Sequence, residues 1–152
     1  MRRCIVGLAV LAVLEVLVAG CGSLVPTAAR SRADGTDYTL HVLNGTTLAV
    51  NVLVNGAPIG LVAAGGAGEF PEARLPALPW HVEARTVSGR PLLGMDVVEG
   101  SVVDVRNADG SSMQSAPFGR TDLSCGRLDL YVGRTSPLGP APGLGQPGDC
   151  VA

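Results

Sequence analysis

Residues 48–61 read LAVNVLVNGAPIGL and contain the strongest short-range structural signal in the chain. Apolar residues take every second position from 48 to 54, which is the period of a half-buried β-strand. Asn55-Gly56 follows, and this pair favours a type I′ turn because both of its residues tolerate a positive φ. Apolar residues return at 59 and 61. The stretch therefore predicts a β-hairpin.

The same two-residue period recurs on both sides of this hairpin. Apolar and polar residues alternate in five further short segments, 38–42, 80–86, 93–97, 103–105 and 128–132. Turn signals separate the segments at intervals of about 8 to 12 residues, and no helical period follows the N-terminal apolar run. We therefore predict an all-β protein, an antiparallel immunoglobulin-like β-sandwich of about seven short strands.

Two segments between the predicted strands lack this alternation. Residues 64–79 are rich in glycine and proline, which predicts a loop or an edge strand. Residues 107–124 are mostly polar and are predicted to form loops at the end of the sandwich. Loops held by a rigid scaffold often carry binding residues, so both segments are candidate ligand sites.

The first 21 residues have the three-part pattern of an export signal. Arg2 and Arg3 precede an apolar run at 4–18, and small residues then lead to Cys21. The sequence LVAGC at 17–21 resembles the lipobox of bacterial lipoproteins. The resemblance implies a signal helix in residues 1–20, cleavage before Cys21, and a lipid on the Cys21 thiol. The chain would then be anchored at the extracytoplasmic face of a bacterial cell membrane.

Two other interpretations of the N-terminal segment stay open. An uncleaved membrane helix needs about 20 apolar residues, and the run at 4–18 is shorter than that. Glu15 also lies within the run, where a carboxylate is costly for membrane insertion and is unusual for the core of a signal. An ordinary cleaved signal without a lipid is the other alternative.

The sequence contains four cysteines, Cys4, Cys21, Cys125 and Cys150. On the lipobox resemblance, Cys4 leaves with the signal and Cys21 carries the lipid, so that two cysteines remain. An even pair in an exported domain predicts a disulfide between Cys125 and Cys150, with free thiols as the alternative. A zinc site needs more ligands than two distant cysteines and two histidines, so we expect no metal.

The remaining chain divides into a tether, a body and a tail. Residues 21–36 comprise the lipidated cysteine and a stretch without an apolar period, which is typical of a flexible linker. The predicted β-sandwich occupies residues 37–133, and residues 134–152 form a Gly/Pro-rich tail held by the disulfide. The net charge is −2, and arginine supplies all the basic residues. Binding to nucleic acid requires clustered Lys and Arg, so this composition argues against it.

A second resemblance covers the body of the chain. The sequence VLVNGAPIG at 52–60 is similar to the opening strand, Asn-Gly turn and strand of PEGA-type surface domains. The likeness ends at residues 75–80, where LPALPW replaces the short Pro-Ala-Gly segment of that family. Together with the lipobox, the pattern resembles uncharacterised bacterial lipoproteins with an immunoglobulin-like or PEGA-like β-sandwich domain. This resemblance implies a fold and a location but no activity.

No arrangement of reactive side chains in the sequence matches a catalytic motif. His41 and His81 fall on the polar faces of their predicted strands, and a metal bound to them would need a third ligand. Glu83 and Arg85 share one face of a strand, which predicts a surface ion pair. The segment 124–126 lacks the glycine pattern of a nucleophile elbow. We expect a protein that is not an enzyme and that uses no cofactor.

Three of the few aromatic residues are candidates for ligand contact. Phe70 and Phe118 lie in the predicted end loops, and Trp80 follows the first of these loops. Trp80 is interpreted first as a core anchor, because its ring buries about 200 Å² or more when it packs inside. A binding contact at the end of the sandwich is the alternative for Trp80.

The sequence thus predicts a membrane-tethered, non-enzymatic accessory or structural interaction module of the cell envelope. It would present a sandwich edge or end loops to another envelope protein. The alternative is a small-ligand or glycan-binding module at the end loops. A cluster of aromatic residues in those loops would favour the alternative, and only Phe70 and Phe118 lie there.

Overall fold

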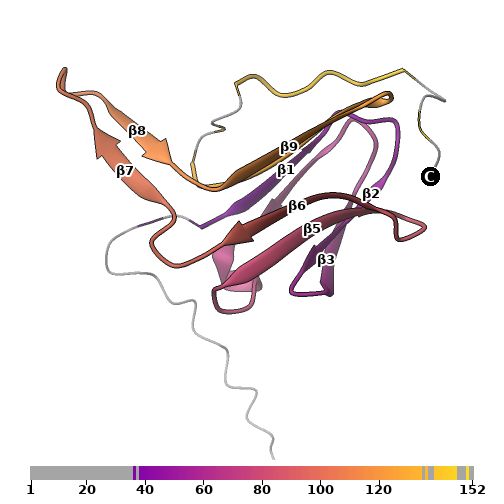
Figure 1. Cartoon of the computed structure of the whole chain (residues 1–152), viewed down its shortest axis with the longest axis horizontal. Helices are drawn as coiled ribbons and strands as arrows, with labels where there is room; N and C mark the ends of the chain where they lie inside the picture. Colours follow the sequence, from indigo (N-terminus) through magenta and orange to yellow (C-terminus); the bar gives the residue numbers. More distant parts are fainter. Residues whose placement is uncertain (1–35, 37, 135, 137–138, 147–149, 151–152) are drawn as a thin grey trace, which may run out of the picture.

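The computed structural model describes residues 36, 38–134, 136, 139–146 and 150 of the chain (Figure 1). The predicted signal helix, the lipidation site Cys21 and the tether as far as residue 35 lie outside these described residues. Within the described part of the chain, no helix has the length and apolar character needed to cross a membrane.

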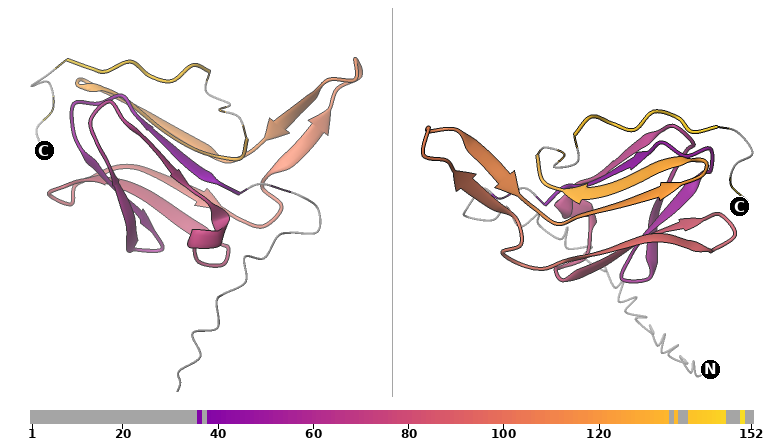
Figure 2. Two further views of the ribbon diagram at one scale, coloured as in Figure 1. Left: turned by 180° about the vertical axis from the view of Figure 1, so that it is seen from behind. Right: turned by 45° about the horizontal axis from the view of Figure 1, so that its top comes forward.

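Two four-stranded antiparallel sheets face each other as a sandwich (Figures 1 and 2). The first sheet has the strand order β4-β1-β10-β9. Its strands are β1 (Leu40–Asn44), β4 (Ala67–Phe70), β9 (Phe118–Leu123) and β10 (Gly126–Val132). The second sheet has the order β3-β2-β5-β6. Its strands are β2 (Val50–Val54), β3 (Ala57–Val62), β5 (Trp80–Thr86) and β6 (Pro91–Val97). The predicted all-β sandwich is confirmed.

A third sheet consists of two strands only. The strands β7 (Val103–Arg106) and β8 (Ser112–Ser115) form an antiparallel hairpin that projects from one end of the sandwich (Figures 1 and 2). A short 3-10 helix, η1 (Glu72–Arg74), lies between β4 and β5. The described residues therefore contain ten strands, against a prediction of about seven.

The turn between β2 and β3 forms as predicted. Asn55 and Gly56 have φ values of 52° and 79°, the positive range that a type I′ turn requires. The Asn55 side chain also holds the neighbouring strand, because its Oδ1 accepts a hydrogen bond from the backbone N–H of His81 at 2.8 Å. Its Nδ2 donates to the carbonyl oxygen of Pro79 at 3.1 Å. Asn55 therefore joins the turn to the start of β5.

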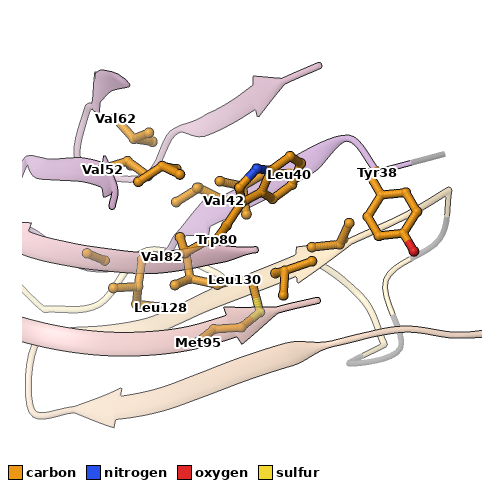
Figure 3. Close-up of a cluster of buried hydrophobic side chains, with 14 of the residues drawn as sticks. Tyr38, Leu40, Val42, Val52, Val62, Trp80, Val82, Met95, Leu128 and Leu130 are labelled. Carbon is orange, nitrogen blue, oxygen red and sulfur yellow. The ribbon is translucent and has the colours of Figure 1, made fainter. Parts of the chain in front are cut away.

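Valine and leucine side chains from both sheets fill the space between them (Figure 3). Tyr38 and Trp80 add two aromatic rings to this core, each only 1% exposed, with ring centroids 6.3 Å apart at an angle of 88°. The indole Nε1 of Trp80 donates a hydrogen bond to the carbonyl oxygen of Pro76 at 2.7 Å. The structure thus places Trp80 as a core anchor, the first of its two interpretations.

The prediction of loops for residues 107–124 is wrong, because β8 and β9 both lie in this segment. In β9 the residues that point between the sheets include Gly119 and Thr121, which are too small or polar to produce an apolar alternation. A Cβ atom on Gly119 would lie 3.3 Å from Cδ1 of Leu93, so glycine lets β9 approach β6 closely.

Segment 64–79 contains β4 at the edge of the first sheet, one of its two predicted forms.

Candidate functional site

The projecting hairpin carries apolar side chains that nothing in the sandwich covers. Val103 and Val105 of β7 lie on the same face as Met113 of β8, because Val105 and Met113 are cross-strand partners. Their exposed fractions are 49%, 42% and 56%. We call these three residues the hairpin face. A contiguous group of exposed apolar side chains is typical of an interaction surface.

Polar contacts at the tip give the hairpin a defined shape. The Asn107 N–H donates to the Ser111 carbonyl oxygen at 2.8 Å, and the Gly110 N–H donates to the Asn107 carbonyl oxygen at 3.0 Å. The Asp109 carboxylate accepts hydrogen bonds from the Ser111 N–H at 2.9 Å and from its hydroxyl at 2.6 Å. These bonds hold the pKa of Asp109 below its usual value. The turn is therefore closed by its own side chains.

The base of the hairpin is tied to the sandwich on the β8 side. The Gln114 Oε1 accepts a hydrogen bond from the backbone N–H of Arg134 at 2.8 Å. The Gln114 Nε2 donates to the Asp104 carboxylate across the hairpin at 3.3 Å. Gly133 has a φ of 101°, and a Cβ atom there would collide with the Gln114 side chain. Gln114 thus fixes β8 to the chain that leaves β10.

The three aromatic candidates from the sequence do not form one site. Trp80 is buried in the core, so its ring presents no face to a ligand. Phe70 is half-buried on β4 and packs against the core, whereas Phe118 is 55% exposed on β9. The strands β4 and β9 are the opposite edges of the first sheet. These rings therefore make no shared stacking platform for a sugar or another planar ligand.

The outer face of the first sheet carries a buried carboxylate between two arginines. Asp129 of β10 is fully buried, and its Oδ1 accepts a hydrogen bond from Nε of Arg120 at 3.0 Å. Nε of Arg127 lies 3.2 Å from the other carboxylate oxygen. Arg127 also donates from Nη2 to the carbonyl oxygen of Pro140 at 2.8 Å. A buried carboxylate paired with two arginines, one of which also donates to a backbone carbonyl, is typical of a structural ion-pair network.

Pro140 belongs to the C-terminal segment 139–146, which runs across the first sheet (Figures 1 and 2). The Gly145 N–H donates to the Gly45 carbonyl oxygen at 2.7 Å. The predicted disulfide between Cys125 and Cys150 is present and closes the chain around this segment, with a Cα–Cα distance of 5.2 Å. We call residues 139–146 and the disulfide the strap. The strap ties the C-terminal segment to the first sheet.

The two histidines lie in different sheets. His41 of β1 stacks on Tyr131 of β10, with ring centroids 4.7 Å apart and planes inclined by 8°. Burial raises the pKa of the Tyr131 hydroxyl. His81 belongs to β5 in the second sheet. Among the described residues, no group of three or more His, Cys, Asp and Glu side chains is arranged to hold a metal ion.

The outer face of the second sheet carries a row of charged side chains. The predicted ion pair forms, since Nη2 of Arg85 lies 3.0 Å from both carboxylate oxygens of Glu83. Next to it, Nδ1 of His81 lies 2.7 Å from Oδ1 of Asp96. This hydrogen bond raises the pKa of His81 above its ordinary value of 6.5. The row is exposed to solvent at His81, and its charges are matched within the sheet.

The sequence predicted a strand at 103–105 but did not select the hairpin face as a site. Alternating apolar residues indicate one apolar face of a strand, and they do not show whether the protein itself covers that face. Met113 lies in a polar segment and carried no signal of its own. A signal was nevertheless present, because the Asn107–Gly110 turn predicts that the segments before and after it pair as a hairpin.

The fold and the disulfide define this chain as a disulfide-containing, all-β protein of the antiparallel sandwich type. No protein-family model matches the chain, and neither a curated protein nor a solved structure is detectably similar to it.

Proposed function

We propose that this chain is a non-enzymatic interaction module of the bacterial cell envelope, anchored through a lipid on Cys21 at the extracytoplasmic face of the membrane. In this proposal the hairpin face binds another envelope protein. The lipobox resemblance supports the anchor, and the disulfide between Cys125 and Cys150 is compatible with an oxidising compartment outside the cytoplasm.

The projecting hairpin is the observation that carries the proposal. A two-stranded sheet is marginally stable alone, and a hairpin kept only for structure gains nothing from apolar side chains turned to solvent. Val103, Val105 and Met113 gather on one face of β7 and β8, outside the core of the sandwich. A partner with an apolar centre would cover them and gain the free energy of removing that surface from water.

The position of the hairpin suits a membrane-proximal partner. The backbone N–H of Gly100, just before β7, donates a hydrogen bond to the hydroxyl of Tyr38 at 2.9 Å. Tyr38 lies just before β1, so the chain enters the sandwich at the end from which the hairpin projects (Figure 1). An anchor at Cys21 would therefore connect to the sandwich at its hairpin end.

The ion pairs that the charged side chains form also favour a role without catalysis. Asp129 is enclosed by two arginines, and Glu83 is engaged by Arg85. A catalytic acid or base needs access to a substrate and a pKa suited to proton transfer. Asp129 and Glu83 are instead held in ion pairs that stabilise the two sheets.

Photo-crosslinking in living cells tests the binding surface in the full-length chain. A photoreactive amino acid in place of Met113 samples the hairpin face, and one in place of Val87 samples an exposed apolar position in the β5–β6 turn (56% and 63% exposed). We expect a discrete adduct with a second protein at Met113 alone. The adduct should disappear when Val103 and Val105 are both replaced by serine. Equal adducts at both positions, or none at Met113, would contradict the proposal.

The anchor has its own test in the same cells. Cys21→Ser should abolish incorporation of labelled palmitate and move the protein out of the membrane fraction. Cys4→Ser is the matched control, because Cys4 lies in the segment that the proposal removes with the signal. Membrane association that survives Cys21→Ser unchanged would show that the apolar segment spans the membrane instead.

A further inference from the structure

The outer edge of β7 has a hydrogen-bonding pattern that can be derived from the turn. The Asn107 N–H donates to the Ser111 carbonyl oxygen and the Asn107 carbonyl oxygen accepts from the Gly110 N–H, so both backbone groups of Asn107 point toward the returning strand, as in a hydrogen-bonded pair. Hydrogen-bonded and non-hydrogen-bonded pairs alternate along an antiparallel ladder. In the observed register, Val105 and Met113 are then hydrogen-bonded to each other, and the backbone groups of Asp104 and Arg106 point away from β8. In the described part of the chain, β7 pairs with no strand other than β8.

This edge is complementary to itself. When a second β7 is placed antiparallel to the first with Val105 opposite Val105, Asp104 of each copy lies opposite Arg106 of the other. The outward-pointing backbone groups of Asp104 and Arg106 are then the ones that face each other, as a new ladder requires. Opposite charges directly across an antiparallel pair stabilise it, and like charges destabilise it. Both the backbone pattern and the charges therefore select the same register.

We infer that the partner at the β7 edge is a second copy of this chain, joined through an antiparallel β7–β7 pair centred on Val105. The product is a four-stranded sheet, β8-β7-β7-β8, with a two-fold axis between the β7 strands. The hairpin faces of both copies lie on the same side of this sheet and form one apolar surface of twice the area. The inference deepens the proposed function, since it uses the same hairpin and enlarges the surface that the envelope partner would cover.

The outer edge of β8 is less suited to pairing with a second copy. The base of β8 is occupied by the contact between Gln114 and the backbone of Arg134. Its outward-pointing backbone groups belong to Ser112 and Gln114, whose side chains bring no opposite charges to a symmetric pair. Of the two edges of the hairpin, the β7 edge combines backbone groups that point outward with self-complementary charge.

Cysteine crosslinking in membranes of cells that express the full-length chain tests the register. Residues opposite each other in a non-hydrogen-bonded antiparallel pair have Cα atoms about 4.5 Å apart, within the range that a disulfide spans. We therefore expect Val105→Cys to give a covalent dimer on a non-reducing gel. Met113→Cys is the matched control, because it lies on the same face with similar exposure. Its symmetry mate would be about 14 Å away across three strand spacings, so it should not crosslink.

Charge exchange in the Val105→Cys background then tests the proposed contacts. Asp104→Arg places arginine opposite arginine, and Arg106→Asp places aspartate opposite aspartate. Each single change should lower the dimer yield at least about five-fold, because like charges then face each other twice across the two-fold axis. The double exchange restores opposite charges and should return the yield to within about two-fold of the starting protein.

The outcomes separate this inference from the proposed function. Two results would overturn the β7–β7 pair. One is crosslinking at Met113→Cys as strong as at Val105→Cys, and the other is a dimer yield that the charge exchanges leave unchanged. No dimer at Val105→Cys together with an intact Met113 photo-adduct would refute the dimer and leave the envelope partner in place. A specific dimer without any Met113 adduct would support the β7–β7 pair and refute the separate envelope partner.

Discussion

Replacing Trp80 with alanine tests how much of the stability depends on the aromatic end of the core. The indole is 1% exposed, contacts Tyr38 edge-to-face, and donates a hydrogen bond to Pro76. Truncation of a buried Trp to Ala removes about 3 to 5 kcal/mol from the free energy of unfolding. The loss should fall in the upper part of this range, because the aromatic pair contributes about 0.5 to 1.5 kcal/mol beyond burial.

Trp80→Phe separates the ring from its hydrogen bond. Phenylalanine keeps most of the apolar volume and can still face Tyr38, but it leaves the Pro76 carbonyl without the indole donor. We expect a loss of about 1 to 2 kcal/mol, which is the net value of a hydrogen bond with a small packing defect. Phe118→Ala serves as the surface control, because that ring is 55% exposed. It should change the free energy of unfolding by less than about 1 kcal/mol.

Urea unfolding followed by far-UV circular dichroism measures all three variants, since this signal does not depend on the tryptophan that is removed. Equal m-values across the series would show that the changes in midpoint report stability alone. A loss below about 2 kcal/mol for Trp80→Ala would refute the core assignment. An equal loss for Trp80→Ala and Trp80→Phe would assign the whole effect to the hydrogen bond rather than to packing.

Three other predictions concern the strap, the buried carboxylate and the exposed histidine. Joint replacement of Cys125 and Cys150 by serine opens a loop with a sequence separation of 25. It should lower the free energy of unfolding by about 3 to 4 kcal/mol in the chain-entropy model, measured by urea titration against the parent with its disulfide intact. Asp129→Asn leaves two arginines without their carboxylate and should cost about 1 to 3 kcal/mol in the same assay, and a stabilising effect would contradict the ion-pair network. Because Asp96 raises the pKa of His81, the stabilising contribution of His81 is complete below its ordinary pKa of 6.5 and is lost as the pH rises through the folded-state pKa. Asp96→Asn should lower the pKa of His81 in an NMR titration, and an unchanged midpoint would show that the hydrogen bond is absent in solution.

Local patterns were sufficient to predict much of the sandwich. For the Asn55-Gly56 turn and the alternating valines of β2, the prediction and the structure agree residue by residue, because turn type and strand period are both local properties. The ion pair of Glu83 and Arg85 was predictable for the same reason, since both residues lie on one face of a single strand. Predicting the disulfide required only the count of cysteines and the compartment that the lipobox resemblance implies.

Features that depend on distant partners were not predictable in this way. Strand β9 was missed because Gly119 faces the interior, and its small size matters only where β6 comes close. The polar residue Asp129 was not recognised as buried, because Arg120 lies on the neighbouring strand β9 and the strap comes from the C-terminal segment. The exposure of Val103 and Val105 could not be predicted either, since alternation alone does not show whether the apolar face of a strand packs against the protein or faces solvent.

The pairing of β1 with β10 has a consequence for how the molecule folds. Leu40 pairs with Val132 and Asn44 with Leu128, so the first strand of the sandwich is completed by its last. Most of the domain must therefore be synthesised before β1 can acquire its central neighbour. Such long-range closure slows folding and leaves an unpaired apolar strand exposed for longer. A chain that stops short of β10 would keep β1 and β4 as a two-stranded remnant, the kind of species that aggregates or that proteases remove.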